Sequence, residues 1–283
     1  LHLSIRRQRQ MCIRDRSLVH QYCIFGNLQG LKEYLSSVNN KQALLEEKDN
    51  FNTTCAHFAA RSGHLPILQF LKENDFTLWS ECEHRFQISP LIFAVSMKHL
   101  ECIEFLSSLS NQKTLDQALL SSSQEGNVEH MKILLDKGAS INAYDEEFCY
   151  SPLAWVCRNG SVFAAQLLVE RGADVNRGRI SPSDPKYLGT TPLLIASNLG
   201  FIHLVEFLIQ KGADLNRPHP TLMWTPCTIA FDSGFIDIAD LLLKSGADIN
   251  YGSQLSYACS QGKVQLVEAL LNRKANPNAT LGD

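Results

Sequence analysis

Residues 191–216 of this 283-residue chain read TPLLIASNLGFIHLVEFLIQKGADLN. Residues 225–250 read TPCTIAFDSGFIDIADLLLKSGADIN, and residues 151–176 read SPLAWVCRNGSVFAAQLLVERGADVN. The three segments share a Thr-Pro or Ser-Pro opening, a central glycine and a Gly-Ala-Asp-x-Asn ending. The chain therefore contains an internal repeat, and the period of that repeat decides the fold class.

The central glycine gives the register of the repeat. It recurs at a mean interval of about 34 residues, and two intervals of 28 residues predict shortened hairpins near residues 111–114 and 251–252. One interval of 40 residues predicts an extended loop from Arg177 to Gly189, which is either a functional loop or a tolerated surface insertion. The aligned hinge residues are Gly26, Gly63, Lys98, Gly126, Gly160, Gly200, Gly234 and Gly262.

Each unit carries the signals of two short helices. Proline at the second position suits the first turn of a helix, and the preceding Thr or Ser can cap it. After the hinge, apolar residues recur at helical spacing, as in residues 202–209. A glycine such as Gly212 then follows the second helix, where a left-handed residue is common. The Asp-x-Asn sequence can hydrogen-bond within its own tight turn.

These motifs resemble the ankyrin repeat family over residues 17–278, in about eight units. The family's Thr-Pro-Leu-His opening is matched by residues 191–194, and Lys98 departs from the family pattern at a hinge. The resemblance implies an all-α ankyrin repeat solenoid of helix-turn-helix units with projecting β-hairpin or loop fingers. It also implies that His20 and His57 hydrogen-bond between neighbouring units. A single unit cannot bury its apolar face, so the units are expected to stack.

The first sixteen residues differ from the repeats. Residues 9–16, RQMCIRDR, resemble a translated sequencing adapter, and the alternative is a basic leader. Without residues 1–16 the chain loses five arginines and one aspartate, and its net charge changes from −3 to −7. That balance favours neither nucleic acid nor an anionic membrane as a partner. We expect an ankyrin domain over residues 17–283 that is truncated at its C-terminus.

Composition excludes several classes of protein. The chain is 45% apolar and 19% charged, as ordinary globular chains are. It has no secretion signal and no stretch of about twenty consecutive apolar residues. Its nine cysteines form no Cys-x-x-Cys pair, so the sequence predicts neither a zinc module nor disulfides. Free thiols favour a reducing compartment, and we expect a cytoplasmic protein, with the nucleus as an alternative.

Catalytic motifs do not emerge at any recognisable spacing, so the sequence predicts neither an enzyme nor a cofactor. Cys82 and Cys149 are the two cysteines that the pattern places in exposed loops. Cys82 and His84 leave open the alternative of a metal-dependent enzyme or hydrolase.

The resemblance places partner contacts on the finger tips and on the exposed side of the first helices, which line a groove. Aromatic anchors on fingers supply much of the binding energy when a partner buries them. The finger positions are Phe51, Phe86, Ile88, Phe148, Tyr150, Tyr187, Leu188, Leu222 and Trp224. The groove positions before the hinges are Arg61, Met97, Arg158, Asn159, Leu199 and Asp232.

The sequence therefore predicts a monomeric, non-catalytic scaffold that binds another protein or peptide. Asp145, Glu146 and Glu147 beside two finger aromatics favour a basic or amphipathic segment. No nucleic acid, membrane or small-molecule substrate is expected. The alternative is the targeting or regulatory region of a larger protein, such as a ubiquitin-ligase adaptor, a kinase, a channel or a host-directed effector.

Overall fold

A computed structural model describes residues 17–82, 88–145, 149–178, 189–219, 223–251 and 254–278. The adapter-like residues 1–16 lie outside this described part of the chain. Within it the secondary structure is entirely helical, without a strand, so the described parts of the fingers are loops and not β-hairpins. This arrangement is the all-α repeat fold that the sequence predicts.

The chain divides into two units. The first consists of Leu1–Ser122 with Glu129–Ser140, and the second of Ser123–Val128 with Ile141–Asp283. The first unit holds α2 (Leu18–Phe25), α3 (Leu28–Ser36), α4 (Lys41–Leu45), α5 (Cys55–Ser62), α6 (Leu65–Glu73), α7 (Pro90–Met97), α8 (Leu100–Ser107), and most of α9 (Gln112–Glu125) and α10 (Val128–Asp136). The second holds α11 (Pro152–Asn159), α12 (Val162–Glu170), α13 (Pro192–Leu199), α14 (Ile202–Gln210), α15 (Pro226–Asp232), α16 (Ile236–Lys244), α17 (Gln254–Ser260) and α18 (Val264–Asn272).

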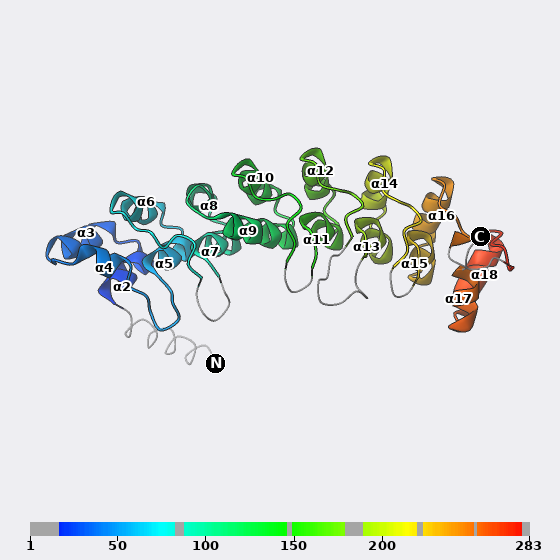
Figure 1. Cartoon of the computed structure of the whole chain (residues 1–283), viewed down its shortest axis with the longest axis horizontal. Coiled ribbons are helices and arrows are strands. Elements are labelled where there is room, and N and C mark those ends of the chain that lie inside the picture. The colour runs from blue at the N-terminus through cyan, green and yellow to red at the C-terminus, as the bar shows by residue number, and fades with distance from the viewer. Residues whose placement is uncertain are drawn as a thin grey trace. The chain divides into compact units, whose positions relative to one another are not determined.

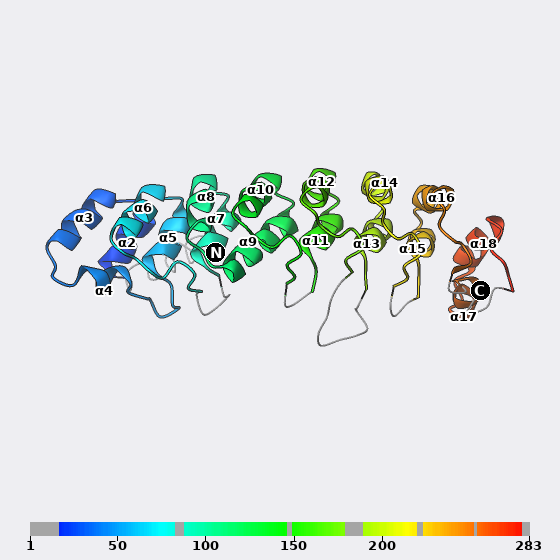
Figure 2. The same cartoon turned by 45° about the horizontal axis from the view of Figure 1, so that its top comes forward.

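Within each unit the helices form two layers, because every repeat places one helix in each. In the first unit, the first helices α2, α5 and α7 pack in succession, and the second helices α6 and α8 pack beside them (Figure 1). In the second unit, α11, α13 and α15 form one layer and α12, α14 and α16 the other (Figure 2). The buried apolar side chains lie between these layers, so each repeat completes the core of its neighbour.

The opening motifs cap the first helices as their residue types predict. The hydroxyl of Ser151 accepts a hydrogen bond from the Ala154 amide at 3.2 Å, and that of Thr191 accepts one from Leu194 at 3.2 Å. Proline occupies the first helical position of α7, α11, α13 and α15, where its missing N–H leaves no hydrogen bond unmade. These caps define where the first helices of four repeats begin.

The hinges all adopt left-handed backbone, with φ between 62° at Lys98 and 82° at Gly234. At four of them, Gly26, Gly63, Gly160 and Gly200, a ring of the next repeat also lies very close. A Cβ atom on Gly63 would lie 2.7 Å from the His99 ring, and one on Gly200 would lie 2.4 Å from the Phe235 ring. Glycine is therefore required there both for its conformation and for the space that it leaves.

The Asp-x-Asn turns of the second unit are joined by a ladder of asparagine side chains. Asp214 Oδ1 accepts from the Asn216 amide at 2.9 Å, which closes the tight turn that the Asp-x-Asn sequence predicts. The Asn216 carboxamide then accepts from the Asp248 amide of the next repeat at 2.8 Å. In the same way, the Asn176 carboxamide accepts from the Asp214 amide at 2.7 Å, and the Asn250 carboxamide accepts from the Asn276 amide at 2.7 Å. The motif thus connects repeats as well as closing its own turn.

Helix α9 differs from the sequence-based register. The pattern places the opening of the fourth repeat at Gln117, but the helix begins at Gln112 and runs for 14 residues. Two features account for the longer helix: the slot that holds proline elsewhere is Ala118, and the Asn111 side chain accepts from the Thr114 amide at 2.9 Å. The helix therefore extends to the cap at residue 111 and replaces the shortened hairpin expected there.

We predict that Lys98→Gly raises the free energy of unfolding by about 0.5–1 kcal/mol, because left-handed backbone disfavours a residue with a Cβ atom. Gly63→Ala should lower it by more than about 2 kcal/mol, because the backbone penalty and the His99 clash act together. Gly262→Ala is the matched control, since φ is 66° there but, chain neighbours aside, no atom of the described residues lies within 4 Å of the added Cβ. Urea denaturation followed by circular dichroism measures all three, and a lower midpoint for Lys98→Gly would contradict the prediction.

Candidate partner-binding surface

Three of the described fingers are closed by a backbone hydrogen bond just before a first helix. In the first described finger, the Asp49 amide donates to the Thr53 carbonyl at 3.0 Å, and the Asn52 amide donates to the Asp49 carbonyl at 2.9 Å. Asn52 has φ of 64°, so the chain reverses at that residue. The Asp49 carboxylate also accepts from the Phe51 amide at 2.9 Å. The loop therefore fixes the backbone of Phe51, a residue that is 52% exposed.

Two fingers of the second unit repeat this closure. The Asp145 amide donates to the Tyr150 carbonyl at 3.2 Å, and the His219 amide donates to the Trp224 carbonyl at 2.7 Å. The residues that precede these two carbonyls, Cys149 and Met223, are left-handed, with φ of 57° and 56°. Sequence reasoning did not predict this closure. A signal for it was present, because each left-handed residue stands two positions before the Ser or Thr that opens a repeat.

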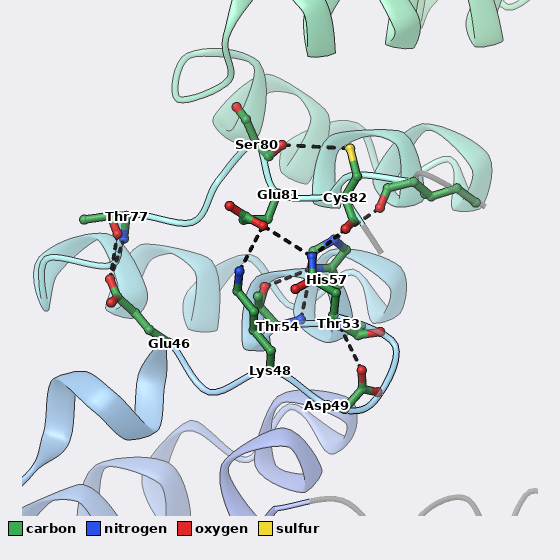
Figure 3. Close-up of polar contacts among 12 residues, drawn as sticks. Glu46, Lys48, Asp49, Thr53, Thr54, His57, Thr77, Ser80, Glu81 and Cys82 are labelled. Carbon is green, nitrogen blue, oxygen red and sulfur yellow. Dashed lines mark hydrogen bonds and ion pairs between the residues drawn. The ribbon is translucent and has the colours of Figure 1, made fainter. Parts of the chain in front are cut away.

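In the first unit, side-chain hydrogen bonds fix one finger to the next (Figure 3). Lys48 Nζ lies 3.0 Å from Glu81 Oε2, and the Asn52 carboxamide donates to the Cys82 carbonyl at 2.7 Å. The hydrogen bonds from Lys48 and Asn52 hold the pKa of the Glu81 carboxyl below its usual value. The sequence from Thr77 to Cys82 is thereby tied to the preceding finger.

His57 joins the same two repeats beneath these fingers. Its Nδ1 accepts from the Thr54 amide at 3.1 Å, so its Nε2 carries the proton and donates to the Ile88 carbonyl at 3.2 Å (Figure 3). His20 Nε2 makes the equivalent bond to the Glu47 carbonyl at 3.1 Å. The expected role of both imidazoles between neighbouring units is therefore confirmed.

A tyrosine and a tryptophan form the base of the finger that precedes α11. The rings of Tyr150 and Trp155 lie 5.1 Å apart and nearly perpendicular, at 82°. The Trp155 indole donates to the Asp145 carboxylate at 2.9 Å, and that carboxylate also accepts from the Tyr150 amide at 2.9 Å. Tyr150 is thus a half-buried ring that is held in place by hydrogen bonds and by an aromatic neighbour.

Trp224 is a correction to the sequence-based surface. Its side chain is only 9% exposed and packs in a cluster with Leu194 and Ile229. The Lys263 ammonium lies 5.2 Å from the ring centroid. The left-handed Met223 reverses the chain just before this residue, so Met223 is 39% exposed while Trp224 is buried. Trp224 therefore belongs to the core between repeats and is not a surface anchor.

The other expected positions that lie within the described residues divide into two groups by their exposure. Arg61, Met97, Arg158, Asn159 and Leu199 are exposed, whereas Ile88 and Asp232 are partly buried. Asp232 forms an ion pair with Lys263 at 2.9 Å. The expected positions Phe86, Phe148, Tyr187, Leu188 and Leu222, together with most of the loop from Arg177 to Gly189, lie outside the described residues.

The structure exposes further apolar side chains that sequence reasoning missed. Phe25 is 65% exposed and occupies the position just before a hinge, as Met97 and Leu199 do. The same register that identified Met97 could have identified Phe25. Phe163, which is 77% exposed, lies on α12 in the second-helix layer, and the repeat pattern gives no signal for it.

The cysteines correct another expectation. Cys149 is 5% exposed, whereas Cys259 is exposed; of the expected loop cysteines, only Cys82 is partly accessible. A hydrogen bond with Cys23, together with burial, raises the pKa of the Cys55 thiol. Burial raises the pKa of Cys102 to about 11 and that of Cys227 to about 12.

The described residues contain no group of three or more metal-ligating side chains and no helix long and apolar enough to cross a membrane. His84, the suggested partner of Cys82, lies outside those residues. The described chain is thus a helical repeat protein whose exposed finger and groove residues are its candidate site.

Comparison with known proteins identifies the repeat. A family model described as "Ankyrin repeats (3 copies)" matches residues 19–117 and 179–253, and one described as "Ankyrin repeat" matches residues 255–280. The chain belongs to the ankyrin repeat family. Ankyrin repeats imply a role in protein–protein interaction, and such domains are generally non-catalytic.

Three curated relatives are similar over parts of the chain. Ankyrin repeat protein nuc-2 of Neurospora crassa is 29% identical over 194 residues, which is 66% of this chain and 17% of that protein. Ankyrin repeat and KH domain-containing protein mask-1 of Caenorhabditis elegans is 28% identical over 41% of this chain and 4% of its own length. The 2-5A-dependent ribonuclease of Mus musculus is 33% identical over 31% of this chain and 12% of its own length. The chain thus spans a minor part of each relative.

We predict that thiol alkylation separates the cysteines by burial and not by loop position. In the folded chain iodoacetamide should modify Cys259 first and Cys82 more slowly, because a thiol must be accessible and ionised to react. Differential alkylation followed by mass spectrometry measures this order. Modification of Cys149 at the rate of Cys259 would contradict it. The thiols expected to react only after unfolding are Cys23, Cys55, Cys102, Cys149, Cys157 and Cys227.

Proposed function

We propose that this chain is a non-catalytic scaffold that binds another protein through its finger tips and through the exposed ends of its first helices. The observation that carries the proposal is the exposure of apolar side chains on closed, internally hydrogen-bonded loops and at repeated pre-hinge positions. Phe51 is 52% exposed and Leu199 is 40% exposed. Apolar groups held in place before binding lose little conformational entropy on binding, so they add more to affinity than mobile ones.

The proposed site includes the described positions Phe51, Ile88 and Tyr150, and the pre-hinge residues of both units. The finger positions outside the described residues remain predictions from the sequence. Trp224 no longer belongs to the set, because it is buried against the preceding repeat. We propose that the scaffold acts as a monomer and that its partner is a protein or peptide rather than nucleic acid, membrane or a small molecule.

The test is an affinity capture from cell lysate with the full chain as bait. Phe51→Ala, Tyr150→Ala and Leu199→Ala together should lose specific partners, because the finger and groove anchors dominate the binding energy. The matched control is Phe163→Ala, which removes a more exposed aromatic ring from the second-helix layer. Circular dichroism confirms that each bait is folded.

The proposal fails if the triple variant keeps all partners or if Phe163→Ala loses the same ones. Either result would move the binding site to the second-helix layer or to the loop from Arg177 to Gly189. Retained partners with Phe163→Ala and lost partners with the triple variant support the proposal.

We also propose that the protein works in a reducing compartment, the cytoplasm or the nucleus. The supporting observation is that six of its described cysteines are buried free thiols, which pack as small apolar residues. A fluorescent fusion of the full chain should therefore fill the cytoplasm, the nucleus or both. Accumulation in the secretory pathway would contradict this placement.

A further inference from the structure

The first unit exposes a strip of residues at its hinges, here defined as residues 24–27, 61–64 and 96–99. They belong to α2, α5 and α7 and the turns after them, and these helices pack in succession. Phe25 is 65% exposed and Met97 is 46% exposed, while Arg61 and Lys98 are also exposed. The strip therefore combines two apolar side chains with two cations.

The strip carries no carboxylate. Its remaining members are apolar, hydroxyl, amide, histidine or glycine residues, and the next acidic residue after Lys98 is Glu101, in the first turn of α8. Arg61 lies with its guanidinium 5.8 Å from the Phe93 ring centroid, which places the charge over the first-helix layer. The cations are thus concentrated along the hinges.

The finger side of the same unit has the opposite charge. Glu46, Glu47, Asp49 and Glu81 lie there with Lys48. An acidic partner would be repelled from these fingers and attracted to the hinge strip. The charge distribution of this unit therefore favours a partner segment with negative charge. It also favours the hinge strip over the fingers as the binding position of that segment.

The length of the hinge strip matches a partner segment that is helical. Packed helices lie about 8–10 Å apart, so Phe25 on α2 and Met97 on α7 are separated by two such steps, about 16–20 Å. A helix rises about 1.5 Å per residue, so about 11–13 residues cover this distance. An amphipathic helix of three to four turns would present apolar residues at i, i+4, i+7 and i+11 along one face, and these residues span about 16 Å.

We propose that the hinge strip of the first unit binds an acidic amphipathic helix of about three to four turns. The apolar face of the helix covers Phe25 and Met97, and its flanking carboxylates pair with Arg61 and Lys98. This inference rests on the proposed protein-binding function and specifies the partner for one unit. The charge of this helix is opposite to that of the basic segment that the sequence predicts for the finger beside Tyr150 in the second unit.

The test uses two designed alanine-rich peptides of 14 residues, which share leucines at positions 2, 6, 9 and 13. One carries glutamates beside the leucines and the other carries lysines at the same places. Fluorescence anisotropy at low salt with the full chain should show the glutamate peptide binding about tenfold more tightly, and salt should reduce the difference.

Charge reversal makes the test specific. Arg61→Glu with Lys98→Glu should invert the preference, so that the lysine peptide binds more tightly. Lys32→Glu with Lys72→Glu is the matched control, because both lysines lie on second helices of the same unit, near Phe70 and Phe105 respectively, and it should leave the preference unchanged. Phe25→Ser with Met97→Ser should lower the affinity for the glutamate peptide about fivefold or more, while the helical circular dichroism of the protein is retained.

The proposal is overturned by equal binding of the two peptides, by a preference for the lysine peptide or by binding of neither at about 1 mM. It is also overturned if the reversal of Arg61 and Lys98 does not change the preference. The lysate capture uses Phe51, Tyr150 and Leu199, which lie outside the strip. Loss of partners there, combined with failure of the peptide test, leaves the protein-binding function supported and rejects only the acidic helix.

Discussion

The fold depends on the left-handed hinge at the end of every first helix. The last carbonyl groups of a helix have no partner within it, and in this chain the next repeat supplies one. The His64 ring lies against Gly26 and its Nε2 bonds the Ile24 carbonyl at 3.2 Å, while the His99 ring lies against Gly63 and bonds the Arg61 carbonyl at 3.3 Å. In the second unit, the carboxamide of Asn159 donates to the Ser123 carbonyl at 3.0 Å. The hinge therefore turns the chain, and at these three positions it also joins a repeat to its neighbour.

This neighbour-only coupling explains why side chains near the hinges can remain exposed on the surface. Stability in a stacked array is a sum of repeat terms and nearest-neighbour terms. The residues that couple repeats are the hinge, the ring after it and the asparagines of the ladder between Asp-x-Asn turns. Phe25, Met97 and Leu199 lie beside these residues but remain exposed. Folding therefore places their backbone without using their side chains, and their chemistry is free to vary with the partner.

Sequence patterns predicted those features whose cause lies within one repeat. The Thr and Ser caps, the proline positions and the Asp-x-Asn turn each depend on residues within a few positions, and the structure contains them. The patterns missed features that depend on two repeats at once. The asparagine ladder requires the backbone of the following Asp-x-Asn turn, and Trp224 is buried because Leu194 of the preceding repeat lies against it. A prediction of the early start of α9 would have required a comparison of Asn111 with Ala118. The repeat register assigns these two positions to different segments.

The closed fingers connect this local physics to binding. Asn52, Cys149 and Met223 adopt a left-handed backbone, which costs a non-glycine residue about 1–2 kcal/mol. Such a conformation persists only where surrounding bonds hold it, and each of these residues donates its amide hydrogen bond back to the first residue of its loop. A glycine would relieve the strain but would also loosen the loop in the free protein. In the proposed binding mode, the hydrogen-bonded ends of these fingers are fixed before a partner arrives, so the entropy of ordering those ends is lost on folding and not on binding.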